Sequence, residues 1–81
     1  MDDAEIVSQI TKLADEEHQL EESHAGEGRL SDEDVKRLRA VEVALDQCWD
    51  LLRQRRARRE VGQDPDGATV RPESTVENYK Q

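Results

Sequence analysis

The sequence predicts an all-α protein: an antiparallel, coiled-coil-like two-helix hairpin with a long second helix and a largely irregular C-terminal tail. Apolar residues recur every three or four positions in two long segments, which is the spacing of one buried helix face. Glycines separate these segments, and a stretch rich in glycine and proline follows the second. The chain has 81 residues, which is room for one folding unit.

The first helix is expected at about residues 3–23. Acidic residues at its start favour the positive end of the helix dipole. Gly26 and Gly28 should end it, because glycine adopts turn conformations easily and weakens helix interiors. The apolar stripe of this helix consists of Ile6, Ile10, Leu13 and Leu20.

The second helix is expected at about residues 32–60. Ser31 can cap its first turn, with Asp34 three residues later in an arrangement that resembles a capping box. No glycine or proline interrupts the segment before Gly62. Its apolar seam consists of Val35, Leu38, Val41, Leu45, Cys48 and Leu52.

These patterns divide the chain into a hairpin at residues 1–61 and a flexible or weakly docked tail at 62–81. The tail begins with a turn-rich stretch at 62–67 and offers few apolar anchors. Those anchors are Val70, Val76 and Tyr79.

A short loop makes the two helices antiparallel, so that facing residues have numbers that sum to about 55. This register places Leu20 against Val35 and Ile6 against Trp49. By the same rule, everything after Arg53 should extend beyond the first helix.

The chain has little material for a buried core, since 33% of its residues are hydrophobic and 40% are charged. Several apolar residues also lie beside the seam, and one partner helix cannot cover them all. A homodimer that forms a four-helix arrangement would cover them. A different protein, or the tail folded back, could do the same. These residues are Val7, Val43, Trp49 and Leu51.

Charge and cysteine content indicate where in the cell the protein is expected and which classes of partner it is expected to bind. A single Cys48 cannot form an intramolecular disulfide, and neither an export leader nor a membrane anchor is evident, so a cytoplasmic location is expected. The net charge of −8 disfavours nucleic acid and anionic membranes. No membrane contact and no cofactor are expected. Attraction between the acidic first helix and the basic end of the second would select the geometry of a dimer.

Five arginines within seven residues are the most distinctive local feature, because Asp50 and Glu60 are the only acids near them. They could form a solvated helix end, a dock for an acidic protein or a phosphate contact with nucleic acid. Trp49 precedes them and could anchor an interface or cover Ile6. The candidate partner-binding residues are therefore Trp49, Arg53, Arg55, Arg56, Arg58 and Arg59.

The triplet Glu16–His18 is the nearest approach to a catalytic cluster. Its middle residue, Glu17, falls on or beside the buried seam, where a carboxylate needs a partner, and Arg37 lies opposite. We therefore expect a structural ion pair between Glu17 and Arg37. Cys48 is expected to be a buried apolar filler, and we expect neither catalytic nor metal-binding residues.

Four further segments have distinctive sequences: Asp15–Leu20, with the letters DEEHQL, Leu45–Glu60, with LDQCWDLLRQRRARRE, Val70–Pro72 and Val76–Tyr79. Together they resemble a small actinobacterial domain-of-unknown-function family of helical hairpins. The resemblance implies a compact helical protein in a bacterial cytoplasm, without a known activity.

The sequence thus predicts a non-catalytic protein-interaction module, homodimeric, that binds an unidentified cytoplasmic protein. The alternative is a nucleic-acid- or ribosome-associated factor that uses the patch from Arg53 to Arg59.

Overall fold

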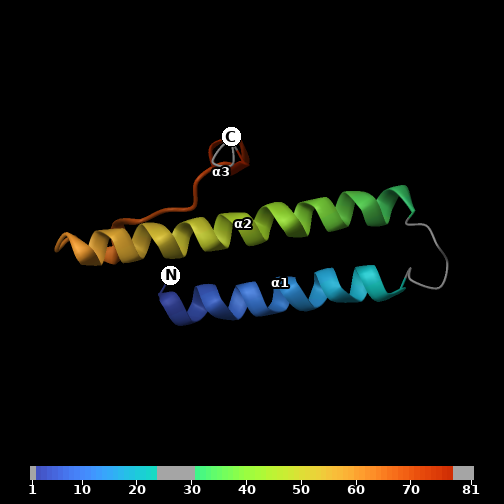
Figure 1. Cartoon of the computed structure of the whole chain (residues 1–81), viewed down its shortest axis with the longest axis horizontal. Helices are drawn as coiled ribbons and strands as arrows, with labels where there is room; N and C mark the ends of the chain where they lie inside the picture. The colour runs from blue at the N-terminus through green and yellow to red at the C-terminus, as the bar shows by residue number, and fades with distance from the viewer. Residues whose placement is uncertain (1, 24–30, 78–81) are drawn as a thin grey trace.

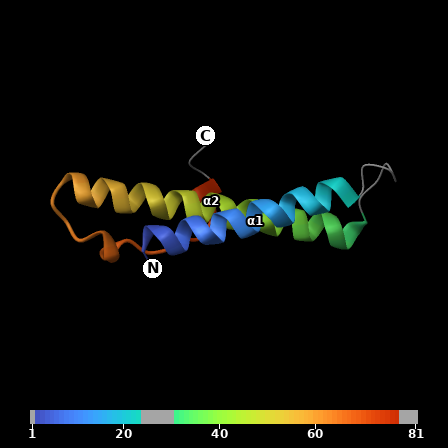
Figure 2. The same cartoon turned by 90° about the horizontal axis from the view of Figure 1, so that it is seen from below.

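The computed structural model describes residues 2–23 and 31–77 (Figure 1). They form α1 (Asp3–Ser23), α2 (Asp32–Glu60), the short 3₁₀ helix η1 (Pro65–Gly67) and α3 (Glu73–Glu77). Both views show α1 lying beside α2, which is longer and extends past the start of α1, while the C-terminal segment returns over α2 (Figures 1 and 2). The predicted all-α hairpin is confirmed, and both long helices span the predicted residues. The expected turn at Gly26 and Gly28 lies outside the described residues.

Side-chain caps fix where both long helices begin. At the start of α1, Asp2 Oδ1 accepts the backbone N–H of Glu5 at 2.8 Å, and Glu5 Oε1 accepts that of Asp2 at 3.1 Å. This reciprocal pair satisfies two free donors of the first turn. At the start of α2, Ser31 Oγ accepts the N–H of Asp34 at 3.2 Å, so the predicted cap is confirmed.

Gly62 ends α2 and reverses the chain. Its φ of 78° lies in the left-handed region that favours glycine. The N–H of Gly62 donates to the carbonyl of Arg59 at 3.2 Å, and that of Gln63 donates to Arg58 at 2.8 Å. These two bonds form a Schellman motif. The motif sends residues 63–77 back along the helix that they have just left.

The core lies between the start of α1 and the second half of α2. Ile6, Ile10 and Leu51 are buried there, whereas Trp49 is 48% exposed. The predicted contact of Ile6 with Trp49 is therefore replaced by packing of Ile6 with Leu51. Residues two apart point about 200° apart around a helix, so both cannot face α1.

The last turns of α2 run past the start of α1, as the register predicted (Figures 1 and 2). These turns still have neighbours. Arg55 and Arg59 reach back and both bind Asp3 at the start of α1, and α2 also contacts η1.

The segment predicted as a flexible or weakly docked tail is held along α2 as far as residue 77. The Gln54 amide donates to the carbonyl of Thr69 at 2.9 Å, and that of Gln47 donates to Arg71 at 3.1 Å. Val76 of α3 is buried. Part of the apolar surface beside the seam is thus covered by the chain itself. Of the other expected anchors, Val70 is exposed and Tyr79 lies outside the described residues.

Candidate protein-interaction face

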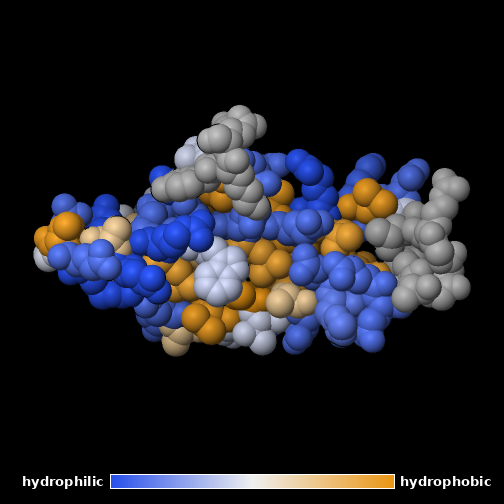
Figure 3. All heavy atoms as spheres, viewed as in Figure 1, coloured by the Kyte–Doolittle hydropathy of each residue, from blue (hydrophilic) through white to orange (hydrophobic). Residues whose placement is uncertain are grey.

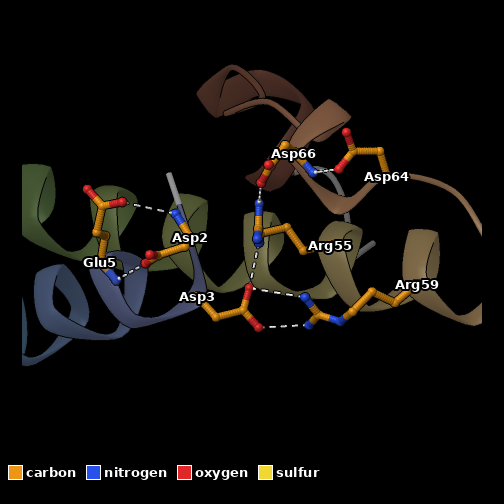
Figure 4. Close-up of polar contacts among 7 residues, drawn as sticks. All are labelled: Asp2, Asp3, Glu5, Arg55, Arg59, Asp64 and Asp66. Atoms are coloured by element: carbon orange, nitrogen blue, oxygen red, sulfur yellow. Dashed lines mark hydrogen bonds and ion pairs between the residues drawn. The ribbon is translucent and has the colours of Figure 1, made fainter.

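Arg55 joins three segments of the chain and is only 5% exposed. Its Nε donates to Asp3 Oδ1 at 2.5 Å, and its Nη1 donates to Asp66 Oδ1 at 2.9 Å (Figure 4). The Asp64 carboxylate accepts the backbone N–H of Asp66 at 2.9 Å and so shapes this turn. Arg55 is therefore a structural residue that ties α1 and η1 to α2.

Arg59 reinforces the same contact. Its Nη2 lies 2.7 Å from Asp3 Oδ2, and its Nη1 lies 3.3 Å from Oδ1. The guanidiniums of Arg59 and Arg55 hold the pKa of the Asp3 carboxyl below its usual value. The attraction between acidic α1 and the basic end of α2, which we expected between two copies, thus acts within one chain.

The other three arginines of the cluster differ in their surroundings. Arg58 extends over Gly67, where an added Cβ would lie 2.6 Å from its Nη1. Arg53 and Arg56 are exposed. Within residues 2–23 and 31–77, Arg56 has no ion-pair or hydrogen-bond partner. The five arginines therefore do not form one basic patch.

A buried ion pair that the sequence did not reveal fixes the returning segment. Asp50 is 1% exposed, and its two carboxylate oxygens accept from the Nε and Nη2 of Arg71, the former at 2.9 Å. Gln54 donates to the same carboxylate at 3.0 Å. Arg71 holds the pKa of Asp50 below its usual value, against the opposing effect of burial. The only sequence signal was the spacing of Gln47, Asp50 and Gln54 on one helix face.

The predicted ion pair of Arg37 involves Glu16 rather than Glu17. Both oxygens of Glu16 accept from Arg37, with Nη2 to Oε1 at 2.7 Å. The bidentate pair lowers the pKa of Glu16. Glu16 reaches Arg37 along the edge of the helix pair, so neither charge has to enter the seam.

The histidine of the Glu16–His18 triplet contacts one carboxylate. His18 Nε2 lies 3.2 Å from Glu22 Oε2 on the exposed side of α1. In the described part of the chain, no three His, Cys, Asp or Glu side chains are arranged to hold a metal ion.

An open groove of about 410 Å³ runs along one flank of the α1–α2 junction. Burial raises the pKa of the Cys48 thiol in its wall, and the thiol lies 3.8 Å from Gln9 Oε1. The residue is partly buried, broadly in agreement with the predicted filler role. Val70 of the returning segment completes the groove, so the helices alone could not have predicted it. The lining residues are Ile6, Gln9, Lys12, Leu13, Ala44, Gln47, Cys48, Leu51 and Val70.

The opposite flank of the junction carries Trp49. Gln47 and Cys48 both line the groove, and a further step of about 100° per residue turns Trp49 away from it. The same argument applies to α1, where Val7 points away from the groove residues Ile6 and Gln9. Figure 3 shows a face on which apolar side chains gather over the α1–α2 junction, with hydrophilic side chains toward both ends.

This Trp49 face consists of two adjacent stripes. On α2, Trp49 is flanked by the partly buried Leu45 and Leu52, spaced four and three residues away. On α1, an uncharged stripe follows spacings of three, four and three, and all its members are exposed. That stripe is Ala4, Val7, Thr11 and Ala14. Because the rest of the exposed surface of α1 is largely charged, the stripe is a distinct place for another helix to pack.

Comparison with known proteins identifies the family. The model of the family described as "Protein of unknown function (DUF2630)" matches residues 2–81. The chain belongs to this family. Uncharacterized proteins of Mycobacterium tuberculosis and Mycobacterium bovis are 47% identical over 77 residues, which cover 95% of this chain and 88% of each relative. These relatives agree with the actinobacterial family that the sequence resembles.

No solved structure matches the chain. Among the helices of the described residues, none is long and apolar enough to span a membrane.

Proposed function

We propose that the protein is a non-catalytic interaction module that works as a homodimer and in that form binds a cytoplasmic protein. The observation that carries the proposal is the Trp49 face. Trp49 is 48% exposed, and Val7 on the adjacent helix is 50% exposed. A chain with so small a core leaves its largest apolar side chain half uncovered.

The energetics of Trp49 support self-association. A tryptophan can bury up to about 250 Å², so covering its exposed half at about 25 cal/mol per Å² would contribute roughly 3 kcal/mol per copy. Two copies would contribute about 6 kcal/mol, before the costs of association are subtracted. The neighbouring leucines and the uncharged stripe of α1 would add to this sum. Tryptophan is also among the residues most often found as interface anchors.

Sedimentation velocity tests the proposal. At tens of micromolar, the wild-type chain should sediment with twice the 9.3 kDa mass of one chain. Val7→Glu places a charge on the exposed face without removing a core residue, and it should yield a monomer with unchanged helical circular dichroism. Val61→Glu makes the same substitution at an exposed site outside the face and should leave the dimer intact. A folded wild-type monomer at these concentrations would refute the proposal.

The alternative is a nucleic-acid- or ribosome-associated factor. It would depend on the exposed Arg53 and Arg56, because Arg55 is buried and Arg59 is paired with Asp3. Such a factor should bind RNA at low salt with an affinity that falls steeply as salt rises. Substitution of both exposed arginines by glutamine should then abolish that binding.

A further inference from the structure

Two charged residues of α2 flank Trp49 and indicate which partner binds there. Glu42 lies seven residues before Trp49, and Arg56 lies seven residues after it. Seven residues are close to two helical turns, so all three side chains lie along one stripe of α2. Both charged residues are exposed. Neither makes an ion pair or a hydrogen bond with a residue of the described ranges.

We propose that the Trp49 face binds a second copy of this chain, with the two α2 helices antiparallel and Trp49 at the two-fold axis. The proposal rests on the proposed function and specifies the partner and the register. In a symmetric antiparallel pair, a residue that precedes the axis by some number of positions faces the residue that follows it by that number. Glu42 of each copy then faces Arg56 of the other.

On the edge of the stripe nearer α1, the layers between the axis and these charges are apolar. Leu45 lies four residues before Trp49, and Leu52 lies three residues after it. In the antiparallel pair, Leu45 of one copy therefore packs near Leu52 of the other. The interface therefore has tryptophan at its centre, leucines on both sides and a complementary ion pair at each end. Such an order, with an apolar core and a charged rim, is typical of protein interfaces.

Charge also excludes the parallel arrangement. Two parallel α2 helices in register would place Glu42 against Glu42 and Arg56 against Arg56, and like charges at an interface are unfavourable. Each chain carries a net charge of −8, so two copies repel one another overall. The contact must therefore form where local charges are neutral or complementary. The Trp49 face meets this condition, because the stripe of α1 beside it is uncharged.

Charge reversal tests the register. Glu42→Arg alone places four arginines at the two ends of the interface, and Arg56→Glu alone places four glutamates there. Each single variant should dimerise at least about tenfold more weakly than the wild type at low salt. An equimolar mixture of the two single variants should form a heterodimer, because both of its ion pairs are complementary. The double variant Glu42→Arg/Arg56→Glu should form a homodimer again.

Matched controls lie in the first turns of α2. Glu33→Arg and Lys36→Glu make the same charge changes at exposed sites away from the Trp49 face. Each should dimerise as the wild type does, and their mixture should show no preference for the heterodimer.

The outcomes separate the register from the proposed function. A wild-type dimer that Val7→Glu disrupts, but that neither charge reversal weakens, overturns the antiparallel register and leaves the interaction module standing. The same conclusion follows if the single variants are weakened but their mixture does not recover. A wild-type monomer overturns both proposals. Capture of RNA by the wild type, lost in Arg56→Glu and not regained in the double variant, assigns the exposed arginine to nucleic acid instead.

Discussion

Substitution of Arg71 by alanine should destabilise the protein more than any loss of an exposed charge. The change leaves the Asp50 carboxylate, which is 1% exposed, without its cation. Breaking a buried ion pair by removing one partner costs about 3–5 kcal/mol. About a third of the Arg71 side chain is exposed to water, which places the expected cost near the lower end, at about 3 kcal/mol. For a domain of this size, the loss should lower the Tm by roughly 12–24 °C.

A second substitution shows whether the unpaired carboxylate causes the loss. Asp50→Ala added to Arg71→Ala removes the buried charge, so the double variant should be more stable than Arg71→Ala alone. Chemical denaturation monitored by circular dichroism measures both variants, and Arg53→Ala serves as a control at an exposed arginine near Asp50. The reasoning is refuted if Arg71→Ala lies within about 0.5 kcal/mol of the wild type. It is also refuted if Asp50→Ala brings no recovery.

Three further predictions concern the acid range, the end of α2 and the thiol. Folding lowers the pKa values of Asp3 and Asp50. The stabilisation that these two carboxylates give the folded state should therefore be complete above about pH 4 and decline as pH falls further. Thermal unfolding scans between about pH 2 and 7 measure this decline. Gly62→Ala should cost about 1 kcal/mol in denaturant titrations because of its positive φ, whereas Gly67→Ala requires only a shift of the flexible Arg58 side chain and should cost less. Cys48 should react with iodoacetamide more slowly than a free thiol at pH 8, because burial raises its pKa; an equal rate would contradict this.

Local sequence signals were sufficient for the helices and their ends. Ser31 and Gly62 act through bonds to residues within five positions, and such bonds depend little on the rest of the fold. The apolar spacing likewise gave the hairpin, because a period of three to four residues has one structural meaning in a segment of this length. The sequence left open whether Trp49 faces solvent or covers Ile6, and the register of α1 against α2 leaves it 48% exposed.

Long-range ion pairs could not be predicted in the same way. The partner of Arg55 depends on the register of α1 against α2. The predicted register placed Leu52 and Arg53 beside Asp3, whereas the structure places Arg55 there, two or three residues further along α2. The partner of Asp50 depends on the direction in which the chain leaves the turn at Gly62. A polar residue at that helical position is ordinarily exposed to solvent, so nothing in the sequence indicates a buried carboxylate.

The arginine cluster shows how such pairs change a functional interpretation. In the sequence, the five arginines form one patch that could hold phosphate or an acidic protein. In the structure, Arg55 is a buried tie between three segments and Arg59 is bound to the start of α1. Arg53 and Arg56 remain exposed and make no ion pair within the described residues, and Arg56 lies on the stripe of Trp49.

The emission of Trp49 tests the central claim most directly, because it is the single tryptophan of the chain and lies at the proposed contact. Its fluorescence should be recorded over a dilution series of the wild-type protein. As the concentration rises and the dimer forms, the emission maximum should move to shorter wavelength and quenching by acrylamide should decrease. An emission maximum that stays at the wavelength of a solvent-exposed indole up to the highest concentration, with unchanged quenching, would contradict the account.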